Sequence, residues 1–377
     1  MSSRSRRDGP RRARRRSRRI VLVVALLAGP LLAEGVLRWL LFSSSALAVS
    51  WGMPLRNSGL FVAARGSEDC SKLQFLFTHP SGPPDELARV SDPDLGWIKL
   101  AIDPETYRHA DGSKLADRRP VLVYGSSFAA CMGEDGGCFE DRLESSELGR
   151  DHCLLNYAVN AYGLDQSVLL FERSVDRYAA LDPVVVLALV PEADLDRCTF
   201  SFFTRPKPRL RRAGDGFVLE RPDDVPTYLA EHPPSIRSYA WRYLLNGLGV
   251  PVEMRQRWEG EPARRAERDR IVDHLLEEFE RACGVRHLEH FALVLHMRAA
   301  LSCAAGTEET ELHARLARLG IPFVDARACV ERALAERRCS LADLFGPTEH
   351  PNAAGITVLF EALALGLRCE FDVDTQR

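Results

Sequence analysis

The stretch VLVYGSSF, residues 121–128, decides the fold of this chain. It is a short apolar run that leads directly into a Gly-Ser-Ser turn, which is the pattern of a buried strand that ends in a loop. Open α/β sheets keep their binding and catalytic groups at the carboxyl ends of the strands. The turn therefore places a serine hydroxyl where such a sheet has its site.

Four further apolar runs follow, and stretches with helical spacing separate them. The runs span residues 153–157, 184–190, 291–296 and 321–324, and the helical stretches span residues 167–180, 264–282, 308–319 and 353–367. Short, nearly continuous apolar strands with helices between them are typical of a parallel sheet that is covered on both faces. We therefore expect an α/β fold, a three-layer α/β/α sandwich around a central, mainly parallel five-stranded sheet.

Length and charge limit which classes of protein this chain can belong to. The 377 residues suffice for one large domain with accessory segments. The formal net charge of −3 hides an asymmetry, because residues 1–19 contain ten Arg and one Asp. The remaining chain is acidic, so the body of the protein has no basic surface of the kind that binds nucleic acid.

Residues 20–42 form an apolar segment directly after the arginine-rich tail. The segment has 23 residues, and Glu34 and Arg38 are its charged members. It is long enough to span a bilayer if this pair lies near the far interface, one helical turn apart and able to pair. By the positive-inside rule, residues 1–19 are a basic cytoplasmic tail. We expect a single transmembrane helix or signal anchor in the cell membrane, with the main domain extracytoplasmic, either periplasmic or at the cell surface.

Two other interpretations of this segment stay open. The tripeptide Ala-Leu-Ala at residues 46–48 resembles a signal-peptidase site, and SRRIVL at residues 17–22 loosely resembles a twin-arginine export signal. Either would make the segment a cleaved signal. The length of the apolar stretch favours an uncleaved anchor.

Ten cysteines are compatible with disulfide bonds in an exported chain. Cys131 with Cys138 and Cys329 with Cys339 make the easiest loops to close. No two cysteines have the C-x-x-C spacing of a zinc or redox site.

Three histidines, His287, His290 and His296, lie around the fourth apolar run. An apolar strand separates them, and this spacing does not indicate a metal site. No cofactor and no metal are expected.

The rest of the chain divides around the main domain, residues 116–377. Residues 43–115 are rich in Pro, Gly and Ser and are predicted to be a spacer that packs partly on this domain. An insertion at about residues 199–262 carries a Gly-Asp-Gly turn, residues 214–216, between strand-like runs. It forms either a lid or partner surface, or a hairpin and helix that only extend the fold.

Three segments together resemble the SGNH/GDSL hydrolase superfamily. They are GSSF at residues 125–128, NYAVNAYGLDQ at residues 156–166 and HPNAAG at residues 350–355, in the expected order. The second segment is similar to that of the membrane-anchored branch of this superfamily. The resemblance covers about residues 118–367 and implies the flavodoxin-like SGNH fold.

The resemblance also assigns roles. It implies that Ser127 is the nucleophile, that His350 is the general base, and that the backbone N–H groups of Ser127 and Ala158 bind the oxyanion. The chemistry agrees, since a neutral serine needs an adjacent base to become nucleophilic. Ser126 stands where the family has an acidic residue, and Ala158 stands at the oxyanion glycine but keeps the backbone N–H.

Two departures from the family pattern concern catalysis directly. Ala193 stands where the family usually has an Asn, and its side chain cannot donate a hydrogen bond to an oxyanion. Pro347 replaces the Asp three residues before the histidine, and a proline cannot orient an imidazole. Glu349 and Asp343 are the candidates for a third member of the site.

These residues predict an extracytoplasmic serine esterase or acyl (acetyl) transferase that acts on carbohydrate or lipid esters through a Ser127–His350 dyad. The altered positions favour a rival, a catalytically weakened domain that binds envelope glycan or a protein partner. A third hypothesis, a membrane-tethered scaffold, predicts no accessible cleft at Ser127. The expected partners are an acylated substrate and the membrane, through residues 20–42, without nucleic acid. The sequence identifies no protein partner.

Overall fold

The computed structural model describes residues 28–57, 68–79, 91–132, 137–203, 205–214, 216–221, 223–234, 236–248, 261–347 and 349–369. The chain divides into two compact units. The N-terminal unit comprises residues 1–83 and 229–258, and the sheet unit comprises residues 84–228 and 259–377. The predicted tail, residues 1–19, and the first part of the predicted span lie outside the described residues.

The sheet unit is built on five parallel strands. They are β3 (Arg119–Tyr124), β4 (His152–Asn156), β5 (Val184–Leu189), β10 (His290–Val294) and β11 (Phe323–Asp325). Their order is β4-β3-β5-β10-β11, and all four neighbouring pairs are parallel. This is the flavodoxin-like strand order. Each strand overlaps its predicted apolar run, so the predicted five-stranded sheet is confirmed.

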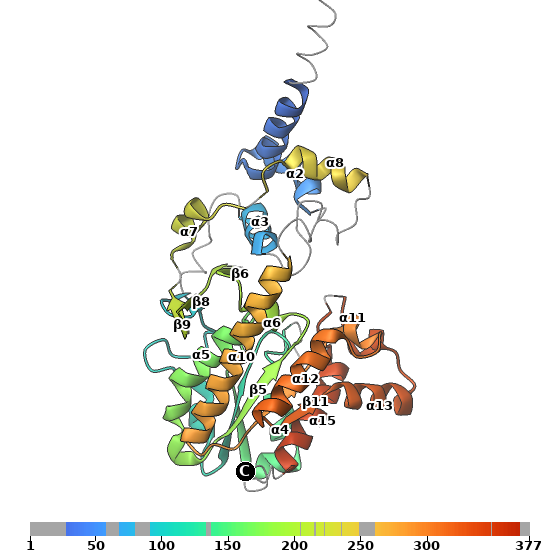
Figure 1. Cartoon of the computed structure of the whole chain (residues 1–377). Helices are drawn as coiled ribbons and strands as arrows, with labels where there is room; N and C mark the ends of the chain where they lie inside the picture. Colours follow the sequence, from blue (N-terminus) through green and yellow to red (C-terminus); the bar gives the residue numbers. More distant parts are fainter. Residues whose placement is uncertain are drawn as a thin grey trace, which may run out of the picture. The chain divides into compact units, whose positions relative to one another are not determined.

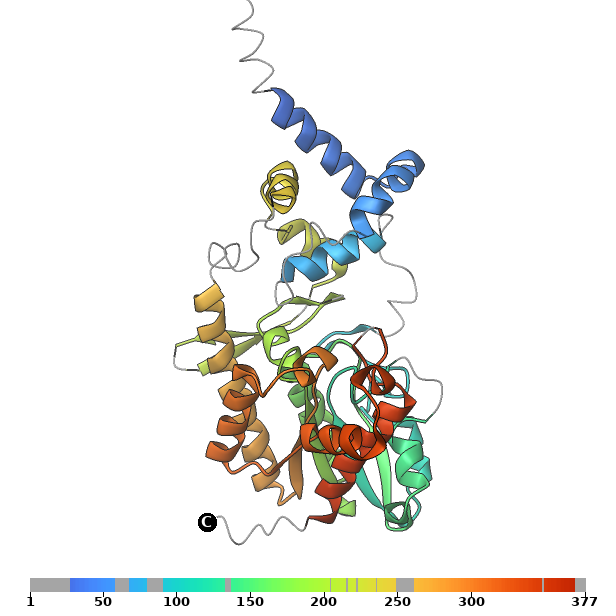
Figure 2. The same ribbon diagram turned by 90° about the vertical axis from the view of Figure 1, so that its right-hand side faces the viewer.

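Helices cover both faces of this sheet (Figure 1, and from the side in Figure 2). The helices that pack on one face are α5 (Leu164–Ser174), α10 (Glu261–Val285) and α12 (Thr307–Leu319). The helices that pack on the other face are α4 (Phe139–Glu144), α13 (Arg327–Arg337) and α15 (Ala353–Arg368). The predicted three-layer sandwich is therefore confirmed, although α4 and α13 were not among the predicted helices.

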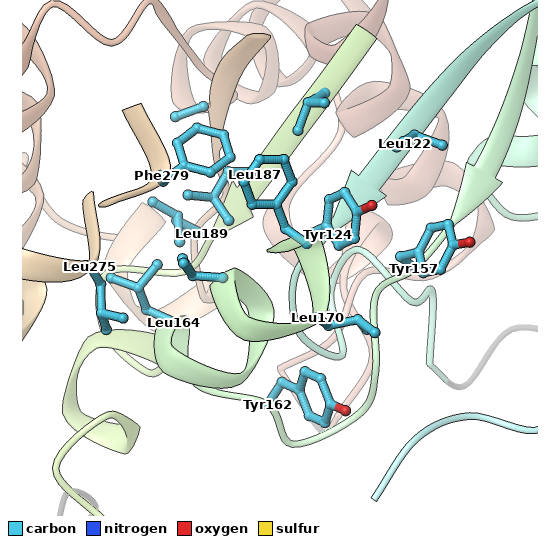
Figure 3. Packing of buried hydrophobic residues seen from close by; sticks show 14 of the residues in the cluster. Leu122, Tyr124, Tyr157, Tyr162, Leu164, Leu170, Leu187, Leu189, Leu275 and Phe279 are labelled. Atoms are coloured by element: carbon cyan, nitrogen blue, oxygen red, sulfur yellow. The ribbon is translucent and has the colours of Figure 1, made fainter. Parts of the chain in front are cut away.

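Two hydrophobic cores result, because successive side chains of a strand point to opposite faces. In β3, Val121 and Val123 pack toward α15, whereas Leu122 and Tyr124 pack toward α5. Figure 3 shows this second core, in which the ring of Tyr124 stacks on Tyr157 with centroids 5.1 Å apart. Complete burial of such side chains contributes about 1.5–3 kcal/mol each. The two cores hold the ends of the strands, and therefore the site, in place.

The remaining elements of the sheet unit are short. They are β1 (Ser91–Asp92), β2 (Gly96–Trp97), β6 (Phe202–Phe203), β7 (Arg205–Pro206), β8 (Arg209–Ala213), β9 (Gly216–Glu220), α6 (Asp194–Arg197), α11 (Arg298–Leu301) and α14 (Leu341–Leu344), with 3₁₀ turns at Ala110–Lys114, Glu147–Arg150, Val175–Arg177 and Ala179–Leu181. Strands β8 and β9 pair as an antiparallel hairpin on either side of the predicted Gly-Asp-Gly turn. Helix α7 (Val225–Glu231) crosses the boundary between the units. The predicted insertion, residues 199–262, is thus divided between them.

The described part of the N-terminal unit is mostly helical. The helices are Ala28–Phe42, α2 (Ala46–Asn57), α3 (Glu68–Thr78) and α8 (Tyr239–Gly247). Its small core contains Leu41, Leu73, Phe77 and Tyr239. Of the predicted spacer, residues 43–83 belong to this unit and residues 84–115 to the sheet unit.

The predicted membrane segment continues into the described residues as the helix Ala28–Phe42. The predicted pair forms, with Arg38 Nε 2.7 Å from Glu34 Oε1. Within the described ranges, each helix by itself is too short or too polar to cross a membrane; Ala28–Phe42 and Ala46–Arg56 meet the length and composition criteria only together, with a bend of 97° between them.

One of the two favoured disulfides is present. Cys131 and Cys138 are bonded, as the sequence predicts. Cys329 and Cys339 are free thiols, so the prediction of this second pair is wrong. Cys329 lies buried on α13, where it is a small apolar member of the core rather than half of a bridge.

Candidate active site

Ser127 lies in the turn that follows β3. Gly125 makes the turn possible, because a Cβ there would lie 2.7 Å from the backbone oxygen of Ala188 in β5. The turn then closes like a first helical turn, since Ala130 N donates to Ser126 O at 3.0 Å. Ser127 is 7% exposed, so little of it reaches the surface.

His350 lies in the short loop before α15. Asn352 caps this helix, because its Oδ1 accepts hydrogen bonds from Ala354 N at 3.0 Å and from Gly355 N at 3.1 Å. Gly355 is required at the first turn, since a Cβ there would lie 2.1 Å from Leu344 O. The motif HPNAAG therefore fixes where the chain enters α15 and, with it, the position of His350.

The two predicted residues meet. His350 Nε2 lies 2.8 Å from Ser127 Oγ, across 223 residues of sequence. The ring of Phe128 packs against the imidazole, with centroids 4.9 Å apart. A base within about 2.6–3.2 Å of a hydroxyl is in reach of its proton. The pair therefore has the geometry that an activated serine needs.

The two candidates for a third member have other hydrogen bonds. Asp343 Oδ2 accepts from Ser340 N at 2.8 Å and from Ser340 Oγ at 2.7 Å, which caps α14. Glu349 Oε2 accepts from Ala299 N at 2.9 Å. Within the described residues, neither carboxylate orients the imidazole of His350 by a hydrogen bond.

The two predicted oxyanion donors differ. Ala158 N donates to Asn156 Oδ1 at 3.0 Å, so this N–H already has an acceptor in the observed conformation. Ala193 offers no substitute, since its side chain has no donor and its N–H donates to Val190 O at 3.0 Å. The N–H of Ser127 has no acceptor among the described residues. In the observed conformation the Ala158 N–H is engaged, and the Ser127 N–H is the open donor.

Asp194 is a site residue that sequence analysis missed. Its buried Oδ2 accepts from Ser126 Oγ and from Val190 N, both at 2.9 Å, and Arg197 pairs with its Oδ1. Burial raises the pKa of Asp194 to about 6, although the Arg197 charge opposes the rise. The carboxylate holds the residue next to the nucleophile. Asp194 opens α6, and no local spacing in the sequence joins it to Ser126, 68 residues earlier.

Asn156 is a second missed residue, at the end of β4. It is buried, and its Nδ2 donates to Ala129 O at 2.9 Å. Its backbone oxygen accepts from Lys99 Nζ at 2.8 Å. Asn156 thus ties β4 to the turn that carries Ser127. It is the first residue of the segment that resembles the superfamily, which could have indicated its role.

A second group of polar side chains lies at the carboxyl ends of β5, β10 and β11. His296 is 1% exposed, with Nε2 2.8 Å from Asp325 Oδ1 and Nδ1 3.2 Å from Glu192 Oε1. Burial alone would lower the pKa of His296, but the hydrogen bonds to Asp325 and Glu192 outweigh it and raise the pKa to about 9. Glu309 and His313 of α12 complete the group, whose members could hold a metal ion.

Comparison with known proteins gives distant structural likenesses. No model of a known protein family matches the chain, and no curated protein matches it. The solved structures similar to it include LAE5, an α/β hydrolase from the metagenome of Lake Arreo, at 12% identity over 67% of this chain and 95% of that one, with a TM-score of 0.39. Axe2, an acetylxylan esterase from Geobacillus stearothermophilus, has 12% identity over 67% of this chain and 95% of that one, with a TM-score of 0.37.

A third similar structure is a GDSL-like lipase from Parabacteroides merdae, at 9% identity over 66% of this chain and 94% of that one, with a TM-score of 0.35.

Proposed function

We propose that this chain is a membrane-anchored serine esterase or acyltransferase of the SGNH/GDSL type, whose main domain is extracytoplasmic and acts on small acyl groups, such as acetyl, on carbohydrates or lipids. The observation that carries this proposal is the 2.8 Å contact between His350 Nε2 and Ser127 Oγ. The strand order and the segments that flank both residues support it.

The mechanism follows from this contact. His350 takes the proton of Ser127 Oγ as the oxygen attacks the ester carbonyl, and Ser127 N–H donates to the oxyanion that forms. The imidazolium then gives its proton to the leaving alkoxide, which leaves an acyl-serine. Water releases the acyl group in an esterase, and a sugar or lipid hydroxyl accepts it in a transferase, with His350 as the base for either.

The altered positions predict slow turnover. The loss of one oxyanion donor typically costs about 10²–10³-fold in turnover. Here the N–H of Ala158 is directed to Asn156, and Ala193 has no side-chain donor. A substrate that breaks the Asn156 contact would recover the second donor.

The second candidate is a binding domain that has lost catalysis. The engaged N–H of Ala158 and the proline at position 347 favour it. It keeps the fold but predicts that Ser127 is no more reactive than any other serine. Reactivity of Ser127 therefore separates the two functions.

The deciding experiment is labelling of the purified full chain with a fluorophosphonate. An activated Ser127 Oγ attacks phosphorus, fluoride leaves, and His350 takes the serine proton. We expect labelling of the wild-type chain and of Ser145→Ala, an exposed serine elsewhere in the sheet unit. Labelling should be lost in Ser127→Ala and in His350→Ala. An unlabelled wild-type chain with an intact thermal transition would favour the binding domain.

We also propose that residues 20–42 anchor the chain in the membrane. Leu31 is 74% exposed, Leu32 69% and Val36 55% on the helix Ala28–Phe42, and such exposed apolar side chains are suited to lipid contact. Sodium carbonate extraction of membranes tests the anchor. The chain should stay in the pellet, and protease added outside the cytoplasm should reach the sheet unit. Release into the supernatant would contradict an integral anchor.

A further inference from the structure

We propose that Glu192, His296 and Glu309 bind a divalent transition-metal ion, Zn²⁺ by preference, at a site separate from the Ser127–His350 pair. The three side chains come from the segment after β5, the segment after β10 and helix α12. One imidazole nitrogen and two carboxylate oxygens form a donor set that suits Zn²⁺.

The spacing of the donor atoms fits an ion. His296 Nδ1 lies 3.2 Å from Glu192 Oε1 and 3.8 Å from Glu309 Oε2, and the three donor atoms lie within 4.8 Å of one another. A tetrahedral zinc site with bonds of about 2.0–2.1 Å places neighbouring donor atoms about 3.3 Å apart. Small side-chain rotations therefore suffice to close the three donors around one ion.

The surroundings orient the histidine. Asp325 Oδ1 lies 2.8 Å from His296 Nε2 and is itself fixed by the N–H of Arg327 at 2.7 Å. Once Nε2–H donates to Asp325, the lone pair of Nδ1 faces Glu192 and Glu309. Histidines that bind metals almost always donate their other N–H to a carboxylate or carbonyl in this way.

Neighbouring groups also fix or bury the oxygens of the two glutamates. Glu309 is 3% exposed, and the Arg327 guanidinium holds both of its oxygens, at 2.8 Å for Oε1 and 2.5 Å for Oε2. Glu192 Oε2 is buried and has no hydrogen-bond partner among the described residues. Nδ1 of His296 can bind an ion only after it loses its proton, so Zn²⁺ uptake would release a proton and place the charge of the ion beside Glu192, Glu309 and Asp325 instead.

A pocket gives the ion access. It has a volume of about 400 Å³ and is lined by Glu192 and Glu309, together with Ala299, Ala300 and the start of α12. Three protein ligands with an open side match a site that keeps one coordination position for water or a ligand oxygen. We infer that this fourth position faces the pocket.

Calorimetric titration of Zn²⁺ into the full chain, freed of metal with chelator and carrying no polyhistidine tag, tests the site. We expect one ion per chain in the wild type, and a loss of affinity of at least about 10–100-fold in Asp325→Asn, as for other groups that orient a metal-binding histidine. Glu192→Gln and His296→Gln remove a direct ligand and should lose more. Glu192→Gln keeps the test valid if the buried His296 variant does not fold.

The matched control is His290→Gln. His290 opens the same strand β10, and its ring nitrogens already contact Glu280 Oε2 at 2.6 Å and Leu288 O at 3.0 Å. It should bind Zn²⁺ like the wild type. Visible absorption of the Co²⁺-loaded chain should show the intense bands of a four-coordinate ion, absent in Glu192→Gln. No Zn²⁺ binding, or binding that Glu192→Gln and His296→Gln leave unchanged, would overturn the proposal and leave a buried ion-pair network only.

Discussion

Two histidines of the sheet unit lie at the carboxyl edge of one sheet, yet their neighbours prepare them for different chemistry. His350 is partly buried and contacts a serine hydroxyl. His296 is fully buried and lies between Asp325 and Glu192. An imidazole beside a hydroxyl can accept its proton, whereas one between two carboxylates is held as a cation or directed toward an ion. The immediate neighbours, more than the position in the fold, decide what a histidine does.

Loss of His350 should have the largest effect on chemistry. We expect His350→Ala to lower the rate of fluorophosphonate labelling, or of p-nitrophenyl acetate hydrolysis, by about 10³-fold or more, because Ser127 loses its base. His296→Gln should leave that rate unchanged, provided that the variant is assayed below its unfolding temperature. Equal losses in both variants would mean that the two regions act as one site.

Loss of His296 should have the larger effect on stability. Removal of one partner from a buried ion pair costs about 3–5 kcal/mol, since the remaining charge is buried without compensation. We expect a decrease of this size in the free energy of unfolding of the sheet unit for His296→Ala, measured by urea denaturation. His350→Ala should cost less, because this imidazole is only partly buried.

A double variant sharpens this measurement. In His296→Ala with Asp325→Asn, one of the carboxylates left without its partner is gone, so part of the lost stability should return. If the double variant is as unstable as the sum of the single ones, the two residues are not coupled and the ion-pair explanation is wrong.

The sequence predicted the fold because the sheet is buried on both faces. Each strand is a nearly continuous apolar run, and such runs stand out between helices. Helix α4 has six residues, too few to show a helical period, and α13 has apolar residues without a continuous stripe. These two helices therefore escaped prediction.

The two histidines also differ in whether a local sequence pattern reveals them. Ser127 and His350 each lie in a local pattern, a strand that ends in a Gly-Ser-Ser turn and a motif that caps a helix, so each was visible in the sequence. The partners of His296 come from residues 192–325, and no local spacing joins them. The expectation that the chain has no metal site rested only on the spacing of the neighbouring histidines. The carboxylates that surround His296 become visible once the fold brings them together.

The titration of Asp194 makes the stability of the region around Ser127 depend on pH. Its pKa is about 6 in the folded protein against 3.8 as the ordinary value, so the folded state binds a proton more tightly than the unfolded chain. The resulting stability is fully present below about pH 4 and is lost as the pH rises through about 6; it amounts to about 3 kcal/mol. Asp194→Asn removes this titration.

The difference in free energy of unfolding between Asp194→Asn and the wild type is the quantity to measure. It should shift by about 2 kcal/mol in favour of the variant between pH 4 and pH 7, because the unfolded carboxyl is already more than half ionised at pH 4. A difference that stays constant over this range would show that Asp194 is already ionised at pH 4, held by Arg197 and Ser126.

The disulfide belongs to the Ser127 side alone. Cys131 and Cys138 are seven positions apart, and a loop this short contributes about 2–3 kcal/mol by restricting the unfolded chain. Cys131 N also donates to Phe128 O at 3.3 Å, next to the ring that packs on His350. Reduction should therefore lower both the unfolding temperature and the labelling rate, while Zn²⁺ binding at His296 persists.

Cys303→Ser, which removes an exposed free thiol, serves as the control and should behave like the wild type before and after dithiothreitol. Cys131→Ser with Cys138→Ser should reproduce the effect of reduction without any reductant. Labelling that survives in this double variant would mean that the hydrogen bonds of Ser126 and Asn156 hold the nucleophile turn by themselves. Labelling that falls while Zn²⁺ binding is retained would establish that the two regions are stabilised separately, although one sheet supports both.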